Sequence, residues 1–282
     1  MLFSVITLEI KAQQLALNCW YRLLRTGVKP HLDVGHQKVH KMLVEISTVT
    51  SQPADFVHKN IIFVDNTIKL LYPSKDRWLD NQVDTSVFDI CVFTNGSLNE
   101  LCFGAGIFIE IENNEDSPDN SLSIPLSKTA TIFQAEMLAI STAANILTSN
   151  SDLNLAIITN SESVMESLQN LVVRTKTKLN CVLVLNQVAQ SNQLKFIWVP
   201  SQSGIQGNDR ADELATTASV LEVMGPDPAP TIALSYIKFI TKEWLNDKAH
   251  QKWSYRRFSP DQNIRILRIV FSLFGYSLTQ KR

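Results

Sequence analysis

The sequence predicts an α/β fold: a mixed five-stranded sheet flanked by helices, with helical extensions at both ends of the chain. Three short strand-like segments follow one another closely between residues 87 and 126. After them, apolar strand-like runs alternate with helical patterns up to residue 220. Closely connected strands indicate an antiparallel meander, whereas strands separated by helices indicate parallel pairing with right-handed crossovers.

Length and composition are those of a globular protein. The chain has 282 residues, of which 45% are hydrophobic and 19% charged, so it can hold one domain of about 130 residues with substantial flanks. We expect an N-terminal helical and linker segment at 1–86, the α/β domain at 87–220, and a linker with a C-terminal helical segment at 221–282. The net charge of −1 gives no overall basic signal, so a nucleic-acid partner would need a local basic patch.

The elements are expected in the following order. Strands are expected at residues 88–94, 102–111, 121–126, 154–159 and 194–199. Helices are expected at residues 8–26, 131–147, 162–173, 179–190, 209–220 and 232–254. The first strand should end at Asn95-Gly96, because this pair is a strong turn signal. PDPAP at 226–230 is a stiff linker, and the apolar, basic tail at 262–282 favours a packing helix over a membrane-surface helix.

Other features indicate a soluble intracellular protein, cytoplasmic or nuclear, that is not secreted and has no membrane partner. The four cysteines are widely spaced and form no CxxC pair, which favours reduced thiols. No apolar run approaches the roughly 18 to 20 residues of a membrane span. His36 and His40 could share a helix face, but no suitably placed Asp, Glu or Cys accompanies them, so a solvated linker is favoured over a metal site.

One stretch is far more specific than the rest. Residues 196–215 read FIWVPSQSGIQGNDRADELA, a strand, a Gly-containing loop and a helix with Asp212 expected in its first turn. This stretch resembles the last motif of the ribonuclease H family as it occurs in non-LTR retrotransposons. FTNGS at 93–97 and FQAEMLAI at 133–140 are similar to two earlier motifs of the same family. The resemblance covers residues 87–219, and residues 8–26 look like the helix that joins a reverse transcriptase to this domain.

The resemblance implies an RNA/DNA hybrid ribonuclease with Mg²⁺ and five chemical positions. Glu136 and Asp212 agree with the family, whereas Asn95 and Asn160 stand where it has Asp, and Gln202 stands where it has His. Each position also has a simpler explanation. Asn95 could form a hairpin corner, Asn160 could cap a helix, and Asp212 could be stabilised by a helix dipole.

The count of carboxylates predicts an impaired site. Two magnesium ions carry +4, which four family carboxylates balance, whereas Glu136 and Asp212 supply only −2. The amide of Gln202 does not titrate near neutral pH, so it cannot replace a His in proton transfer. We therefore expect weak metal binding through Glu136 and Asp212, and little or no cleavage.

Binding could outlast cleavage, because hybrid recognition relies on phosphates and 2′-hydroxyls. Candidate substrate contacts implied by the resemblance are Gly96, Ser97, Asn99, Gln134, Ser161 and Asn208. A basic handle of Arg174, Lys176 and Lys178 is an alternative to a solvated helix end. Two other functions remain open: a weak ribonuclease using Glu136, Asp212 and Asp209 around one metal, and a non-catalytic module whose terminal helices bind a protein partner.

Overall fold

The computed structural model describes residues 14–15, 53–57, 62–63, 69–80, 82–99, 102–111, 121–229 and 231–255. Of the helix expected at 8–26, only Gln14 and Leu15 fall within these ranges, and both are helical. The His36 and His40 pair and the tail at 262–282 lie outside the described residues. Within them, no helix is long and apolar enough to cross a membrane.

The main sheet has six strands in the order β2-β8-β6-β3-β4-β5. Their bounds are β2 Lys69–Leu71, β3 Ile90–Leu98, β4 Phe103–Ile111, β5 Ser121–Leu126, β6 Asn154–Thr159 and β8 Gln193–Trp198. Strands β3, β4 and β5 form the predicted antiparallel meander, and β3, β6, β8 and β2 are parallel. The mixed sheet is confirmed, but the count of five was one too low, because β2 comes from the segment read as linker.

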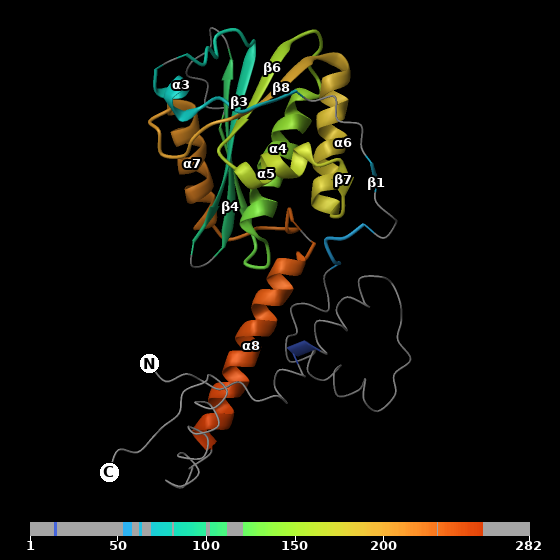
Figure 1. Ribbon diagram of the computed structural model, residues 1–282, viewed down its shortest axis with the longest axis vertical. Helices are drawn as coiled ribbons and strands as arrows, with labels where there is room; N and C mark the ends of the chain where they lie inside the picture. The colour runs from blue at the N-terminus through green and yellow to red at the C-terminus, as the bar shows by residue number, and fades with distance from the viewer. Residues whose placement is uncertain are drawn as a thin grey trace, which may run out of the picture.

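Helices cover both faces of the sheet (Figure 1). Their bounds are α3 Lys75–Leu79, α4 Ile132–Leu147, α5 Glu162–Gln169, α6 Lys176–Ser191, α7 Gln206–Ser219 and α8 Leu234–Tyr255. Helices α4, α5 and α6 lie over one face, and α7 and α3 lie over the other. A separate two-stranded sheet pairs β1 (Ile62–Phe63) with β7 (Val172–Val173).

Alternation along the central strands divides the core into two layers. In β3, Ile90 and Val92 belong to the cluster beneath α4 and α6, whereas Cys91 and Phe93 belong to the cluster beneath α7. Strand β6 alternates in the same way. Because successive side chains of a strand point to opposite faces, residue 95 should face α7 and residue 96 should face α4. Residue 95 should therefore contact α7, and residue 96 should contact α4.

The structure corrects the predicted boundaries of three elements that carry or flank site residues. Strand β3 does not turn at Asn95-Gly96 but continues to Leu98, with Asn95 paired opposite Gly106 of β4. Helix α5 ends at Gln169, and Val172–Val173 pair with β1 instead of continuing it. Helix α7 begins at Gln206, so Asp212 lies in its second turn rather than its first.

Helix α7 lies unusually close to β4. A Cβ atom on Gly106 would stand 2.1 Å from the carbonyl oxygen of Ala211 and 2.4 Å from the amide nitrogen of Ala215. Gly104, two residues earlier on the same strand, faces the same helix at a similar distance. Any side chain at these positions would therefore displace α7, whose carboxylate at residue 212 must reach β3.

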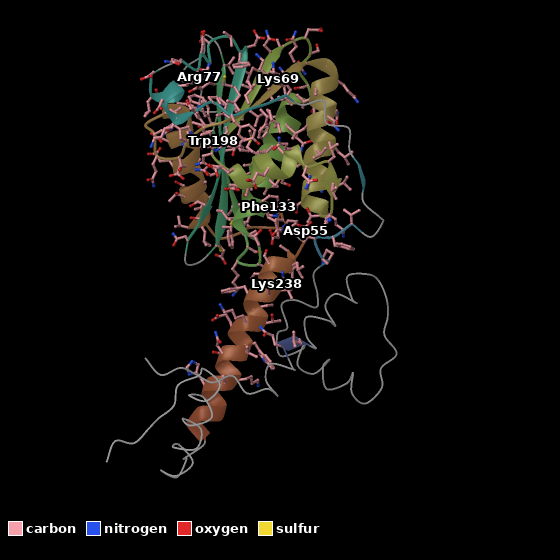
Figure 2. All side chains as sticks on the ribbon, viewed as in Figure 1. Asp55, Lys69, Arg77, Phe133, Trp198 and Lys238 are labelled. Atoms are coloured by element: carbon pink, nitrogen blue, oxygen red, sulfur yellow. The ribbon has the colours of Figure 1, made fainter. Side chains whose placement is uncertain are left out.

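The chain after α7 returns to the body of the domain before α8 leaves it. The Gln134 side chain donates from Nε2 to the carbonyl oxygen of Thr231 at 2.8 Å, and Ala54 forms a parallel bridge with Ile232. Asp55 lies at the end of the domain from which α8 departs (Figure 2). The predicted helix at 232–254 is confirmed as α8.

Candidate functional site

Two parallel strands bring the altered positions side by side. Thr94 of β3 and Thr159 of β6 are paired in register. Asn95 and Asn160, one residue further on, are therefore neighbours at the carboxyl end of this parallel pair. The carboxyl ends of parallel strands are where open α/β sheets hold their ligands. The structure thus brings Asn95 and Asn160 close together, although 65 positions separate them in the chain.

Asn95 is tied directly to the retained carboxylate of α7. Its Nδ2 donates to Oδ1 of Asp212 at 2.7 Å, and the Asn95 residue is only 4% exposed. Asp212 itself is exposed. A buried amide therefore contacts the inner oxygen of a carboxylate whose other side faces solvent.

The orientation of the Asn95 amide follows from its second bond. Its Oδ1 accepts from the backbone N–H of Gly96 at 2.8 Å. A flipped amide would place Nδ2 against that N–H and Oδ1 against the carboxylate of Asp212, which opposes two donors and two acceptors. The amide must therefore present N–H to Asp212, at the point where a bound cation would need a free oxygen.

Glu136 approaches from the opposite face of the sheet. Gly96 lets α4 come close to β3, because a Cβ atom there would stand 2.7 Å from Cγ of Glu136 and 3.0 Å from its backbone nitrogen. The Ser161 hydroxyl donates to Oε2 of Glu136. Burial raises the pKa of the Glu136 carboxyl, and the bond from Ser161 opposes that rise in part.

Asn160 is not the helix cap that its position suggested. The N-cap of α5 is Ser161, whose Oγ accepts from the backbone N–H of Val164 at 3.4 Å. The carbonyl oxygen of Asn160 accepts from Nε1 of Trp198 at 3.3 Å, which fixes the backbone where β6 ends. The bond between Ser161 and Glu136 could not be foreseen, because no local pattern relates residues 25 positions apart.

Gln202 lies in the loop between β8 and α7, and its side chain is exposed. Its φ of 51° is in the left-handed region, which His, Asn and Asp adopt several times more often than other non-glycine residues. Among the described residues no hydrogen bond joins its side chain to Glu136 or Asp212. The loop therefore holds Gln202 in a backbone conformation that a His would tolerate at least as well.

The candidate substrate contacts divide into rim and interior. The Ser97 hydroxyl lies 3.3 Å from that of Thr216 at the surface, so both can reach a phosphate. Gln134 is 1% exposed, and its side chain bonds Thr131 and Thr231, so it offers no free surface in this arrangement. Asn208 is also buried, at 3%.

The proposed basic handle loses its last member, Lys178. Lys178 is 5% exposed, and its Nζ donates to the carbonyl oxygens of Ser167, Asn170 and Val172. Its ammonium therefore holds the end of α5 and β7 against α6 and cannot contact a phosphate. Arg174 is exposed and Lys176 half-buried, so the surface charge of this region is smaller than the sequence implied.

The residues present do not fit a site for two magnesium ions. Magnesium requires oxygen ligands in near-octahedral geometry and gives up its water reluctantly. Of the five chemical positions, Glu136 and Asp212 are the carboxylates, and each already accepts a hydrogen bond, from a hydroxyl and an amide respectively. Among the described residues, no group of three or more His, Cys, Asp or Glu side chains could hold a metal ion. Asp209 is exposed in the first turn of α7 and does not complete such a group.

The family comparison agrees with this topology. Residues 88–220 match the family model described as RNase H. This part of the chain is an RNase H-like domain. It is related to RNA/DNA hybrid ribonucleases, and its match begins two residues before β3 and ends one residue after α7.

Solved structures with similar folds cover about half of the chain. A foamy viral protease-reverse transcriptase in complex with dsDNA is 21% identical with a TM-score of 0.41, over 49% of this chain and 98% of that one. LC11-RNase H1 in complex with an RNA/DNA hybrid is 23% identical with a TM-score of 0.38, over 46% and 95%. Prototype foamy virus protease-reverse transcriptase is 21% identical with a TM-score of 0.41, over 50% and 22%. No curated protein matches the chain significantly.

Proposed function

We propose that the RNase H-like domain binds RNA/DNA hybrid or related nucleic acid and cleaves it little or not at all. The observation that carries this proposal is the bond from Asn95 Nδ2 to Asp212 Oδ1. An amide N–H has its positive end on the hydrogen, so it stabilises the carboxylate in the absence of a metal ion. Asn95 also supplies no charge to balance a cation. Both effects oppose occupancy by magnesium.

Binding is expected to be weak. The net charge of the chain is −1, and Lys178 is committed to backbone carbonyls. Polar groups such as Ser97 and Thr216 can still donate to phosphate oxygens and 2′-hydroxyls. With few basic contacts, affinity should fall with a shallow slope as the salt concentration rises.

We further propose that the domain derives from a non-LTR retrotransposon polyprotein and acts inside the cell. The sequence of residues 196–215 supports the origin. The described cysteines Cys91, Cys102 and Cys181 are free thiols, which supports a reducing compartment.

A cleavage assay separates this proposal from a weak ribonuclease. Labelled RNA/DNA hybrid is incubated with the full chain and either Mg²⁺ or Mn²⁺, and the same hybrid is used for binding by fluorescence anisotropy. We expect binding without turnover. Turnover that disappears in Glu136→Ala would contradict the proposal and favour a one-metal enzyme using Glu136, Asp212 and Asp209.

Restoring the family residues is the stricter experiment. The triple variant Asn95→Asp, Asn160→Asp and Gln202→His should gain metal-dependent cleavage if only these ligands have changed. Asp is nearly isosteric with Asn, and the left-handed backbone at residue 202 accepts His. The matched control adds Glu136→Ala to the triple variant and should be inactive. A folded but inert triple variant would show that the loss extends beyond these positions. The intact mass of the natural chain should be checked, because deamidation of its Asn95-Gly96 pair would create a carboxylate at residue 95.

A further inference from the structure

A hollow lies at the β2 edge of the sheet, on elements that the RNase H match mostly leaves out. It has a volume of about 410 Å³, within the usual range of small-molecule sites. β2, α3 and the loop that follows them supply most of its wall, and β8 supplies the rest. Most of these residues precede residue 88, where the family match begins. The hollow is therefore a feature of this chain beyond the matched domain.

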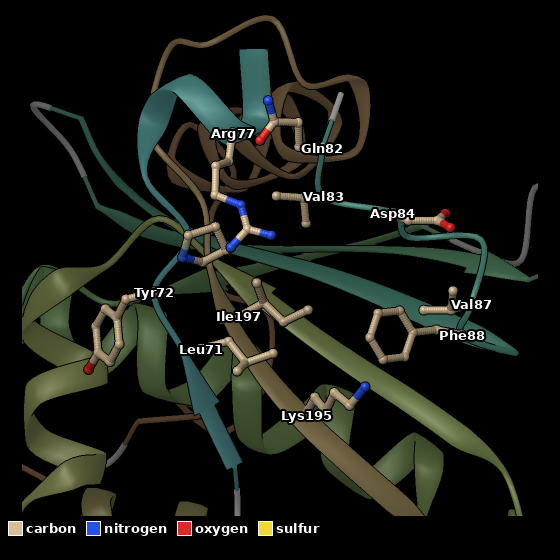
Figure 3. A pocket seen from close by; sticks show the side chains of 11 residues that line it. Leu71, Tyr72, Arg77, Gln82, Val83, Asp84, Val87, Phe88, Lys195 and Ile197 are labelled. Atoms are coloured by element: carbon tan, nitrogen blue, oxygen red, sulfur yellow. The ribbon is translucent and has the colours of Figure 1, made fainter. Parts of the chain in front are cut away.

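Two cations flank an apolar floor in this hollow. Figure 3 shows Arg77 reaching over Ile197 and Lys195 lying beneath Phe88, with Leu71 and Ile197 between the two cations. Nζ of Lys195 is 4.9 Å from the centre of the Phe88 ring. Within the described residues neither cation has a carboxylate partner. Two unpaired positive charges beside apolar surface favour a ligand with an anionic end and an apolar body.

The rim offers acceptors as well as cations. Asp84 is the one carboxylate that lines the hollow, and its Oδ1 accepts from the backbone N–H of Ser86 at 3.0 Å and from the Ser86 hydroxyl at 2.6 Å. Its Oδ2 and the Gln82 side-chain oxygen remain as acceptors at the rim. These oxygens can accept hydrogen bonds from the amino group of a heterocyclic base, a group that a simple inorganic anion lacks.

We propose that this hollow binds a nucleoside monophosphate, either free or at the 5′ end of a strand. The phosphate would lie between Arg77 and Lys195, because a doubly charged anion matches two cations and the Arg fork binds phosphate through two N–H groups. The base would lie on the neighbouring Val83, with its amino group toward Gln82 and Asp84 at the rim. This binding does not depend on the Asn95–Asp212 site or on hybrid cleavage.

The test uses methyl NMR spectra of the full chain, titrated with adenosine 5′-monophosphate. We expect shifts at the methyl groups of Leu71, Val83 and Ile197. Arg77→Gln and Lys195→Gln should each weaken binding about tenfold, because each removes one charged contact to the phosphate. The matched control is Arg174→Gln, which removes an exposed cation elsewhere and should leave the affinity unchanged. Arg77 is exposed, so its variant should fold normally, and unfolding midpoints check this.

Two further probes identify the recognised chemistry. Adenosine and inorganic phosphate should each bind more weakly than the nucleotide, and equal binding by either one would overturn the proposal. No methyl shift at about 5 mM nucleotide, above the Kd of an ordinary weak site, would also overturn it, as would unchanged affinity in both Gln variants. If a 5′-phosphorylated tetranucleotide binds more tightly than the mononucleotide, the site is supported and its ligand is the 5′ end of a strand. If the mononucleotide binds more tightly, the site is supported and its ligand is the free nucleotide.

Discussion

Replacing Asn95 with Asp tests whether the amide has taken over the role of a cation. Oδ1 of the new carboxylate could keep its bond from Gly96, since the donor there is a backbone N–H. Its other oxygen would face Oδ1 of Asp212 at about the present N···O distance of 2.7 Å. Two carboxylates at that distance cannot both be ionised unless a metal ion lies between them. Without a metal ion, one of the two must hold a proton.

The size of the effect follows from geometry. With charge centres about 4 Å apart and an effective dielectric constant of about 20, the repulsion is about 4 kcal/mol. Because Asp212 is exposed, solvent screening reduces this to about 1 to 3 kcal/mol. Loss of the amide bond to a charged group adds about 1 to 2 kcal/mol. We therefore expect Asn95→Asp to lower the free energy of unfolding by about 2 to 5 kcal/mol at pH 8 without metal.

The pH dependence has a definite sign. The repulsion raises the pKa of one carboxyl of the variant pair above its unfolded value of about 4. The penalty is therefore absent below about pH 4 and grows as the pH rises through the raised folded pKa. The variant should approach the repulsion-free stability at low pH and fall furthest below it at pH 8.

Urea unfolding at pH 4.5 and pH 8, with and without Mg²⁺ or Mn²⁺, measures this. Metal should recover stability in Asn95→Asp but not in the natural chain. Asn95→Leu is the matched control, since it removes the amide bond without adding charge and should show neither pH-dependent nor metal-dependent loss. If Asn95→Asp is as stable as the natural chain at pH 8 without metal, the argument from the Asn95–Asp212 bond is refuted.

Two other changes probe the same region. Glu136→Gln should stabilise the fold by up to about 1 kcal/mol above pH 7 and have less effect at pH 4. The reason is that burial raises the pKa of Glu136, so the ionised carboxylate is disfavoured in the folded state as the pH rises. Thermal unfolding across pH measures this, and a destabilised variant at pH 8 would contradict it. Gly106→Ala should lower the free energy of unfolding by more than about 3 kcal/mol, because its Cβ would lie 2.1 Å from a backbone oxygen of α7. Ala105→Gly on the same strand is the control and should cost less. Equal losses in urea unfolding would show that α7 moves away freely.

The sequence predicted the sheet and its helices because periodic apolar runs determine these elements directly. It failed at Asn95-Gly96, where a local turn signal competed with nine consecutive ladder pairs between β3 and β4. Tertiary pairing outweighs local turn preference in such a strand. It also missed β2, since three residues with no alternation carry no readable period, and their partner β8 lies more than 120 positions later.

The candidate site shows the same division between local and long-range information. Motif resemblance indicated which residues to compare, and the parallel register places Asn95 beside Asn160 as expected for strand ends. The hydrogen bonds that decide the chemistry were not readable. Asp212 bonds Asn95 across 117 positions and Ser161 bonds Glu136 across 25. Lys178 resembled an exposed helix-end cation, yet three backbone carbonyls enclose its ammonium.

Because β2 pairs with β8, the folding unit begins before residue 88, where the family match begins. Without it, β8 would be the edge of the sheet and would present unpaired N–H and C=O groups to other chains. Trp78, which follows β2 on α3, is 6% exposed and donates from Nε1 to the carbonyl oxygen of Trp198 at 3.0 Å. A fragment cut at residue 88 would lose both the edge cover and this buried ring. It should therefore self-associate, whereas one that begins before Lys69 keeps a short, lysine-bearing edge that discourages strand addition.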